Sequence, residues 1–404
     1  MTDLLSLSEA IARIEAEMPR LPAEHIDLFA AAGRVLAEDV VSGIDLPPFD
    51  TSAMDGYAVR ARDAHVGARL RVVQDIHAGG WPESPVSAGE AARIMTGAPM
   101  PIGADSVVPV ENTDADWSAG QSPVDVTVRI AATAGGSVRK RGENVARSQT
   151  VLRAGHMLRA VDVGMLGSLG LSRVTVVRRP RVVILTSGDE LAPYGQPLRD
   201  GEIYDGNTPM LAAALARFGA TPHVLPPARD TFESVRGTFE AALALTPDLI
   251  VSSAGVSVGA ADFVKDVLDQ LGEVGFWRIN LRPGKPLAYG RLGMAPFFGL
   301  PGNPVSAFVT CELIVKPAVY AMLGRADDTE RVIATTEHDI DSDGRRSYLR
   351  CALTATPDGW TARLTGTQSS GALYSLVVAN GLLIVEEGVR HVPAGTAVQV
   401  QLLH

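Results

Sequence analysis

Cysteine and histidine are too sparse in this sequence to build a structural framework. Only two of the 404 residues are cysteines, Cys311 and Cys351, and they share no motif. A disulfide scaffold and a cysteine-rich zinc site are therefore excluded, and a reducing cytoplasm fits this composition. The eight histidines are scattered, with no pair two or four residues apart, so a histidine-based metal site has little support.

Positive charge is also in short supply. The chain has 36 lysines and arginines against 46 aspartates and glutamates, which gives a net charge of −10 at pH 7. This acidic balance argues against a general nucleic-acid-binding protein, which needs a basic face. The N-terminus combines acidic Asp3 with a helical pattern, and no apolar run reaches ~18 residues. We therefore expect no signal peptide, no membrane span and no nucleic-acid partner.

The composition itself is globular, with 46% hydrophobic and 20% charged residues. At roughly 150 residues per domain, the length predicts two to four domains. The 40 glycines and 26 prolines indicate many tight turns and several β-rich pieces. We predict a multidomain α/β plus β protein in four parts: a discontinuous helix-rich domain I (1–45 and 139–177), an inserted β-rich domain II (46–138), a three-layer α/β/α domain III (178–325) and a small β-barrel-like domain IV (326–404).

Helical patterns mark domain I. Apolar residues recur at 3.6-residue spacing from Leu7 to Met18, and Ser6 with Glu9 forms a capping box before them. We expect two further helices in this domain, over residues 24–38 and 159–169.

Between residues 180 and 323, β-type runs alternate with helical patterns. Such alternation predicts a parallel sheet that is covered by helices on both faces. Asn207 and Asn303 each stand shortly before a proline, as capping residues do at a helix start. The expected strands are 181–186, 223–226, 249–252, 277–280 and 296–300, and the expected helices are 208–218, 231–245, 261–271 and 304–322.

Ligands of an open parallel sheet bind beyond the carboxyl ends of its strands. Five loops would meet at that edge: 187–190, the loop with Asp230, 252–262, 282–286 and 299–304. The loop 252–259 contains only small residues and runs into a helix, so it predicts a phosphate cradle. The alternative is an ordinary tight turn between a strand and a helix.

Four carboxylates, Asp189, Glu190, Asp230 and Asp262, fall in these loops. They would repel a phosphate unless Mg²⁺ bridges carboxylate and phosphate oxygens. The alternative for Asp230 and Asp262 is a simpler role, in which each stabilises the first turn of a helix.

Charged residues in three other runs are also candidates. Arg282 and Lys285 supply positive charge in a loop whose prolines make it rigid. The basic run 139–144 either clamps an anion or forms an ordinary solvated face. Asp55, in the loop 47–58, is either a functional carboxylate or part of a plain Asp-Gly turn.

A hydrolase is the competing interpretation of the loop 255–259. Its sequence GVSVG matches a nucleophile elbow around Ser257. The histidines that follow, His338 and His391, lie in the β-rich tail rather than in the sheet. Stoichiometric labelling of Ser257 by a fluorophosphonate would support this alternative.

Taken together, these runs resemble the molybdopterin molybdenumtransferase family, that is, the MoeA proteins and the matching C-terminal part of gephyrin. The resemblance covers essentially the whole chain, and its longest motifs are specific. They are PPFDTSAMDGYAV (47–59), IMTGAPMPIGADSVVPVE (94–111), VRKRGEN (138–144), TSGDEL (186–191), VSVGAADF (256–263), RPGKP (282–286) and GLPGNPVSAF (299–308).

The resemblance implies an enzyme that inserts molybdenum from molybdate into adenylylated molybdopterin, with Mg²⁺, and releases AMP. It implies a homodimer, with domain III as the molybdopterin-binding domain and with the site completed by domain II of the partner subunit. Asp55 and Thr96 would come from that partner. The α/β domain would contribute Glu190, Asp230, Asp262, Lys285, Pro301 and Pro304, and the molybdate contacts would be Ser306, Arg350 and Ser370. Substrate-binding roles also fall on Ser187, Gly188, Asp189, Gly255, Ser257, Gly259, Arg282 and Asn303.

Specific roles follow from combining the resemblance with the chemistry of these residues. We expect Glu190 and Asp262 to hold Mg²⁺, and Asp55 to assist hydrolysis or metal positioning. Lys285 and Arg282 would attract molybdate. Transient contacts with a molybdopterin adenylyltransferase and with molybdoenzymes are also implied. The alternatives are an adenylyltransferase or a non-catalytic molybdopterin-binding scaffold.

The sequence departs from the family pattern at three positions. Asn144 stands where the family often has Asp, and Ala254 stands where Gly is usual. Arg282 replaces a common Lys, which keeps the charge but allows a bidentate contact with an anion.

Overall fold

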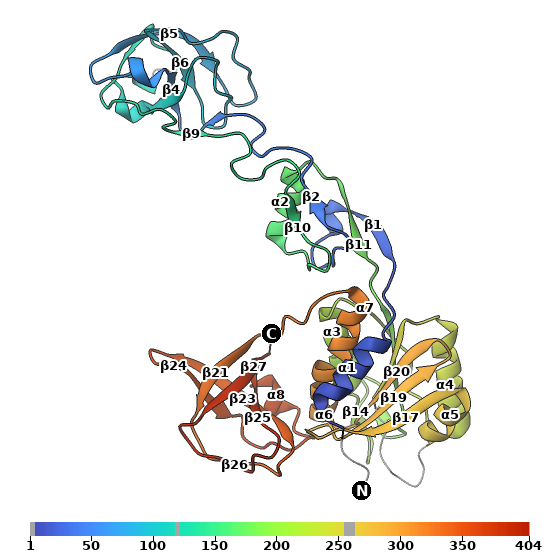
Figure 1. Cartoon of the computed structure of the whole chain (residues 1–404). Coiled ribbons are helices and arrows are strands. Elements are labelled where there is room, and N and C mark those ends of the chain that lie inside the picture. The colour runs from blue at the N-terminus through green and yellow to red at the C-terminus, as the bar shows by residue number, and fades with distance from the viewer. Residues whose placement is uncertain (1–4, 118–121, 254–262, 404) are drawn as a thin grey trace. The chain divides into compact units, whose positions relative to one another are not determined.

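The computed structural model describes residues 5–117, 122–253 and 263–403. The chain forms two compact units (Figure 1). Unit 1 comprises Met1–Ala37, Gly155–Arg159 and Arg173–His404, and unit 2 comprises Glu38–Ala154 and Ala160–Ser172. The finer division into four domains stays a prediction.

A six-stranded sheet forms the centre of unit 1. Its order is β15 (Thr221–Val224), β12 (Arg181–Thr186), β16 (Leu249–Ser253), β20 (Ala295–Leu300), β19 (Pro286–Leu292) and β17 (Gly272–Arg278). The first four strands are parallel, as predicted. Strands β12, β16 and β20 are buried along almost their whole length, as continuous apolar runs in a covered parallel sheet should be.

The expectation of a purely parallel sheet was wrong at β19, which the sequence analysis missed. β19 is antiparallel to both β20 and β17. Only Gly293, with φ +55°, and Met294 separate β19 from β20, and so short a connection permits a hairpin but no crossover. Because β17 is reversed twice relative to β20, it runs in the same direction as the parallel strands. The carboxyl ends of all five predicted strands therefore lie at one edge of the sheet, as expected.

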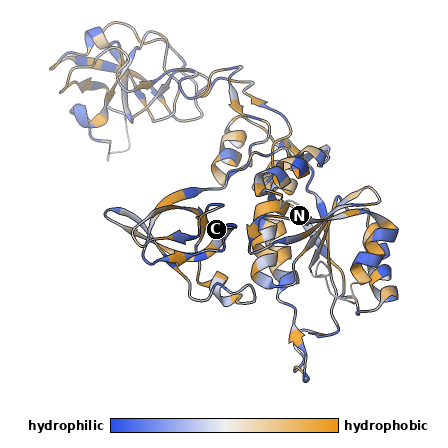
Figure 2. Cartoon of the chain, turned by 60° about the horizontal axis from the view of Figure 1, so that its bottom comes forward, coloured by the Kyte–Doolittle hydropathy of each residue, from blue (hydrophilic) through white to orange (hydrophobic). Residues whose placement is uncertain are grey.

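Helices cover both faces of this sheet, which confirms the three-layer arrangement (Figure 1). One face packs against α1 (Leu7–Glu17), α3 (Asn207–Arg217), α6 (Pro304–Thr310) and α7 (Lys316–Leu323). The other face packs against α4 (Phe232–Ala244) and α5 (Phe263–Leu271). In Figure 2 the outer helices of this unit carry hydrophobic and hydrophilic residues on different sides, as amphipathic helices on a sheet do.

The N-terminal segment contains one helix rather than two. Ser6 caps α1, and its side chain accepts a hydrogen bond from the Glu9 backbone N–H, as predicted. The helix predicted over 24–38 is wrong: this segment forms β1 (Ala23–Asp27), a 3₁₀ turn (Leu28–Ala30) and irregular chain. β1 alternates exposed and half-buried residues and pairs with β11 (Arg173–Val177), so its period is two rather than 3.6.

The helix that follows β20 is the longest apolar element. It runs through α6, a π-helical turn (Cys311–Val315) and α7. The whole span Pro304–Leu323 is long and apolar enough to cross a membrane by length and composition, although the sequence was expected to contain no such span. Since 89% of its most apolar window is buried inside the protein, it is a core helix of unit 1.

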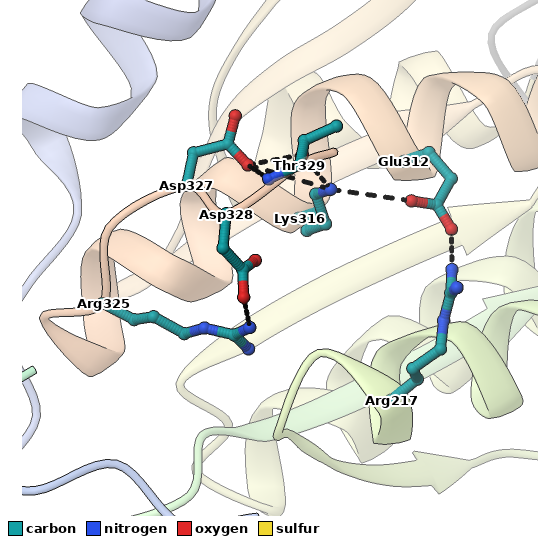
Figure 3. A network of polar contacts seen from close by, with 7 residues as sticks. All are labelled: Arg217, Glu312, Lys316, Arg325, Asp327, Asp328 and Thr329. Carbon is teal, nitrogen blue, oxygen red and sulfur yellow. Dashed lines mark hydrogen bonds and ion pairs between the residues drawn. The ribbon is translucent and has the colours of Figure 1, made fainter. Parts of the chain in front are cut away.

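Polar contacts join this helix to the segment that leads into the C-terminal barrel (Figure 3). The buried Lys316 ammonium donates to Thr329 Oγ1 and lies 3.9 Å from both Glu312 and Asp327. Burial lowers the pKa of Lys316, although Asp327 opposes this. Removing one partner of such a desolvated network would leave another charge buried and unpaired, which is costly. The network therefore holds the segment with Asp327 and Thr329 against the helix.

The C-terminal strands close into a barrel, as predicted. Five strands pair in a ring: β23 (Arg346–Thr356), β24 (Gly359–Leu364), β21 (Arg331–Thr336), β27 (Ala397–Leu402) and β25 (Gly381–Val385), which returns to β23. β18 (Leu281–Arg282), from the central domain, adds to β23. The short elements β22 (Ile340–Asp341), β26 (His391–Val392) and α8 (Tyr374–Val377) complete this part.

Unit 2 is mainly β-structure. Its five-stranded sheet has the order β7 (Ser106–Pro109), β4 (Gly56–Val59), β6 (Glu90–Ile94), β5 (Arg69–Ile76) and β8 (Asp125–Thr127). Two smaller pairs are β3 (Thr51–Ser52) with β9 (Val138–Arg139), and β2 (Val40–Val41) with β10 (Thr150–Leu152). Two 3₁₀ turns, Ala61–Asp63 and Val110–Asn112, and the helix α2 (Ala160–Ser168) complete unit 2, and α2 matches the helix predicted near 159–169.

Candidate functional site

A cavity of about 230 Å³ lies at the carboxyl ends of β12, β16 and β20. It is lined by three residues that the sequence predicted, Ser187, Glu190 and Pro304, and by Asn207 and Ser253, which were not predicted as site residues. The cavity therefore brings together segments that are far apart in the chain, from Thr186 to Leu373. Its position agrees with the rule that ligands bind beyond the carboxyl ends of parallel strands.

Asn207 organises this cavity instead of capping α3. Its side-chain amide donates to Ser253 Oγ at 2.8 Å and to the Gly302 carbonyl at 2.7 Å, so it links the ends of β16 and β20. The capping oxygen belongs to Asp205, whose carboxylate accepts from the backbone N–H groups of Asn207 and Thr208 at 2.9 and 3.0 Å. The sequence pattern placed the helix start correctly but assigned the cap to the wrong side chain.

The loops after β12 and β15 present three exposed carboxylates, Asp189 and Glu190 in the first and Asp230 in the second. The Asp189 N–H donates to an Asp230 carboxylate oxygen at 3.3 Å, and the Asp230 N–H donates to Asp189 in return at 3.3 Å. The Glu190 carboxylate folds back over Gly188, where an added Cβ would lie 2.6 Å from Glu190 Oε2. Gly188 also has φ +154°, so a glycine at this position lets the carboxylate lie against the loop.

A second cavity, of about 670 Å³, borders the same loop. Gly188 and Asp189 line it, together with Tyr194 and the segment 224–229. Both cavities share Thr186, Leu191 and Asp205 in their walls. The carboxyl edge thus offers two adjoining spaces, which suits a ligand with more than one part.

Two of the predicted cations, Arg282 and Lys285, lie between β17 and β19. Lys285 is exposed and Arg282 is half-buried. The loop packs tightly on α6, because a Cβ at Gly284, where φ is +111°, would lie 2.5 Å from Thr310 Oγ1. This close approach is the physical reason for the glycine between the two prolines.

Arg350 is a buried cation of the C-terminal barrel. It lies on β23 with no exposed surface, and its guanidinium donates to Ser375 Oγ and to the carbonyls of Thr367 and Ser369 at 3.0–3.1 Å. Within the described part of the chain, it forms no ion pair. Burial, with a further contribution from the positive charge of Arg282, lowers the pKa of Arg350 to about 10, so it stays protonated at neutral pH. Arg350, a buried cation without an ion pair among the described residues, favours an anion nearby, whereas Arg282 also interacts with Asp343, whose pKa it lowers.

The turn after β20 connects the helix α6 with the barrel. Ser306 is buried in the first turns of α6, and the Val305 N–H donates to the Ser370 carbonyl at 3.0 Å. Pro301 is buried and Asn303 is exposed. Asn303 occupies the N-cap position, as predicted, but its side chain makes no capping hydrogen bond.

Asp55 and Thr96 lie together in unit 2. One Asp55 oxygen accepts from the Thr96 backbone N–H at 2.7 Å and from its hydroxyl at 3.0 Å. Both residues are exposed. The neighbouring Gly56 allows β4 to approach β7, because a Cβ there would lie 2.1 Å from the Val108 carbonyl oxygen. The sequence proposed Asp55 and Thr96 separately, and the fold makes them one group.

The basic run 139–144 is largely neutralised within unit 2. Lys140 Nζ lies 2.8 Å from Asp50, and Arg141 Nε lies 2.7 Å from Asp45. The hydrogen bond from Lys140, with one from the Arg141 backbone N–H, lowers the pKa of Asp50. These pairs favour the solvated-face interpretation over an anion clamp.

Several predicted residues lie outside the described part of the chain: Ala254, Gly255, Ser257, Gly259 and Asp262. The phosphate cradle, the nucleophile elbow and one magnesium ligand therefore stay predictions. Within residues 5–117, 122–253 and 263–403, no group of three or more His, Cys, Asp or Glu residues is arranged to hold a metal. Of the two histidines that a hydrolase would need, His391 pairs with Asp341 at 2.8 Å on the barrel surface, which raises its pKa.

Comparisons with known proteins agree with this architecture. Residues 5–170 match the MoeA N-terminal region (domain I and II), residues 183–321 match a probable molybdopterin binding domain, and residues 334–403 match the MoeA C-terminal region (domain IV). The chain is 38% identical over 403 residues to molybdopterin molybdenumtransferase 2 of Mycobacterium tuberculosis strain H37Rv, covering 96% of this chain and 97% of that protein. It is 34% identical over 409 residues to the molybdopterin molybdenumtransferase of Haemophilus influenzae, covering 98% of each.

A crystal structure gives the same result for the fold. The molybdopterin biosynthesis moea protein from Pyrococcus horikosii has a TM-score of 0.81 with this chain at 32% identity, and the match covers 99% of both chains. The chain belongs to the molybdopterin molybdenumtransferase (MoeA) family.

Proposed function

We propose that this protein inserts molybdenum from molybdate into adenylylated molybdopterin and releases AMP, and that it does so in the cytoplasm. Family membership supports the general activity, and Arg350 is the single structural observation that carries the proposal. A fully buried guanidinium without an acid partner in the described chain, close to Arg282, suits a small dianion. Arginine binds tetrahedral oxyanions through two parallel hydrogen bonds.

The cavities at the carboxyl edge would hold the larger substrate. Ser187 and Gly188 would approach its phosphates closely, and the adjoining spaces of about 230 and 670 Å³ match a molecule that has a pterin part and an adenylyl part. Pro301, Asn303 and Pro304 would shape the wall beside β20, with Ser306 and Ser370 toward molybdate. Exposed Lys285 would attract both anions to this edge.

The exposed Glu190 carboxylate at this edge is a donor that suits Mg²⁺. Glu190 and Asp262 would hold it, because Mg²⁺ usually takes one or two carboxylates together with substrate phosphate oxygens. When bound, it supplies positive charge that neutralises the phosphoanhydride. Asp189 and Asp230 keep the loop in place through their reciprocal backbone contacts.

Asp55 of a second copy would complete the site. Its carboxylate is oriented by the Thr96 N–H and hydroxyl, and it is free to accept a proton from water or to position the metal. Water attacks the phosphoanhydride, the bond between the two phosphates breaks, and AMP leaves. The dithiolene sulfurs then replace oxygen ligands of molybdate, a ligand exchange that requires no covalent intermediate with the protein.

The direct test is to mix the purified protein with adenylylated molybdopterin, Mg²⁺ and molybdate, and to follow AMP release. We expect molybdate-dependent AMP and a product that reconstitutes a molybdenum-free apoenzyme. Tight pterin binding without AMP at any molybdate concentration would contradict the proposal and indicate a scaffold. Consumption of ATP with molybdopterin alone would indicate an adenylyltransferase instead.

A complementation experiment tests the homodimer. Copies with Asp55→Asn and copies with Glu190→Gln should each be inactive, and mixing them should restore part of the activity if the two residues act from different subunits. No recovery in a demonstrated mixed dimer would place both residues in one subunit's site.

A further inference from the structure

A second strongly charged cavity lies at the opposite end of the central sheet. It has a volume of about 590 Å³ and is lined by Arg34, Arg178, Arg179, Arg181 and His223, with Glu24 at one side. Arg181 begins β12, and Thr221, its partner in the parallel register, begins β15. The cavity is therefore at the amino ends of strands whose carboxyl ends border the proposed active site.

The arginines of this cavity exceed the acids that pair with them. Arg178 forms two hydrogen bonds of 2.8 Å with Asp248, and Arg34 pairs with Glu24. Arg181 donates from its guanidinium to the Thr246 carbonyl at 2.8 Å, which is a neutral partner. The exposed Arg179 side chain has no hydrogen bond or ion pair within the described residues. Four arginines against two carboxylates leave two positive charges, in a protein whose net charge is −10.

Two of these guanidiniums are fixed in position before any ligand arrives. Arg34 is only 9% exposed and also donates to the Val177 carbonyl at 3.0 Å. Its buried Nε has no hydrogen-bond partner among the described residues. Arg178 is held by its bidentate contact with Asp248. The two fixed guanidiniums are paired with acids but still have N–H groups toward the cavity wall, and the two surplus charges lie beside them on the exposed Arg179 and Arg181. Part of this cationic site is therefore preorganised.

We propose that this cavity binds a small phosphate-bearing anion with at least two negative charges, at a site separate from that of the insertion reaction. Two surplus charges match a diphosphate group better than a single carboxylate, and guanidinium forks suit phosphate oxygens. The volume exceeds that of one phosphate and accommodates a molecule of nucleotide size. The six residues of β12 separate the two sites, so both ligands bind at the same time.

Inorganic pyrophosphate is the probe for this site. Isothermal titration of the full chain in 150 mM NaCl without Mg²⁺ should show saturable binding with one pyrophosphate per chain, whereas sulfate should bind much more weakly. Arg179→Glu should weaken pyrophosphate binding at least about tenfold, because it replaces an unpaired contact cation by a repelling charge. Arg236→Glu, on the exposed face of α4, is the control and should leave binding unchanged.

Variants at the other end of the sheet separate this proposal from the proposed function. Arg350→Ala should abolish molybdate-dependent AMP release and leave pyrophosphate binding intact, while Arg179→Glu should leave AMP release intact. Unchanged binding in Arg179→Glu, or loss of binding in Arg350→Ala, would overturn the assignment of this cavity. Neither result depends on whether the insertion activity itself is confirmed.

Discussion

Exposed carboxylates gather in the loops at one end of the central sheet, and arginines gather at the other end. At the carboxyl end, Asp189, Glu190 and Asp230 are exposed in the loops. At the amino end, Arg178, Arg179 and Arg181 surround a cavity. Helix dipoles account for part of this asymmetry, because the crossover helices begin at the carboxyl edge, where their positive ends favour acids, and end at the amino edge.

The comparison shows that an acidic edge can still serve anionic substrates. The cation that the carboxyl end needs comes mainly from outside the sheet, since Arg350 belongs to the barrel and reaches this region beside Arg282. In the proposed function, Mg²⁺ would supply the remaining charge. The amino end, in contrast, has Arg181 at the start of β12 and Arg178 and Arg179 just before it.

Removal of the Arg350 guanidinium should have the largest effect on AMP release. Arg350→Ala should reduce molybdate-dependent AMP release about 10³-fold, because a preorganised donor to the anion is removed. Arg363→Ala, which removes an exposed arginine of the same barrel, is the matched control and should retain activity. Substantial activity in a folded Arg350→Ala protein would show that the anion binds elsewhere.

Neutralising Glu190, the proposed Mg²⁺ ligand, should have the next largest effect. Glu190→Gln should lower AMP release about 10²-fold and shift the Mg²⁺ dependence to higher concentrations, with thermal unfolding unchanged because Glu190 is exposed. Glu233→Gln, on the first turn of α4, should have no such effect. Unchanged AMP release in Glu190→Gln would remove Glu190 from the metal site.

At the amino end of the sheet, the Arg178–Asp248 pair should make the free energy of unfolding depend on pH. Burial raises the pKa of Asp248, but hydrogen bonds from Arg178 and from the Arg181 N–H outweigh this, and the net pKa is below its ordinary value of 3.8. The pair therefore stabilises the fold above about pH 4, and this stability is lost as the pH falls through the lower folded pKa. Asp248→Asn should cost about 2 kcal/mol of unfolding free energy at pH 7.

Urea unfolding between pH 7 and pH 2 checks this expectation. The difference in unfolding free energy between the wild type and Asp248→Asn should narrow only below pH 4. A difference that stays constant down to pH 2 would mean that the Asp248 carboxylate does not titrate with folding.

The smallest effect concerns the glycine beneath Glu190. Gly188→Ala should lower AMP release about tenfold by displacing the Glu190 carboxylate, and should cost about 1 kcal/mol of stability. Gly237→Ala, in the interior of α4 with nothing near its Cβ position, should instead stabilise the protein slightly. Equal behaviour of the two variants in both assays would show that the loop adapts to a side chain.

Much of the central domain was predictable from local pattern. The strand 181–186 matches β12 at both ends, and the other predicted strands and helices overlap observed ones. Buried apolar strands and amphipathic helices leave strong periodic signals because each element must cover its own apolar surface. Two elements lacked a clear pattern in the sequence. The analysis predicts no strand at β19, and it predicts a helix where β1 lies, because β1 is half-exposed in a two-stranded pair and so has little apolar periodicity.

Residue types and loop order were enough to nominate the candidate site. They placed Asp55, Glu190 and Arg282 among the functional residues, because glycine-rich turns, paired acids and rigid basic loops carry chemical meaning without a fold. Arg350 was indicated only by the resemblance to the MoeA family. They were not enough for Asn207, which looked like a helix cap and instead links the ends of two strands.

The sequence by itself determined the family, the order of elements and the chemical groups available to them. The tertiary structure decided which charges are free: Lys140 and Arg141 are paired with Asp50 and Asp45, whereas Arg350 is buried without an acid partner in the described chain. It also placed Arg34 beside Arg178 and Arg181, far from it in the sequence, in one cavity. The physical reason is that desolvation and pairing depend on distance in space, and only the folded chain sets those distances.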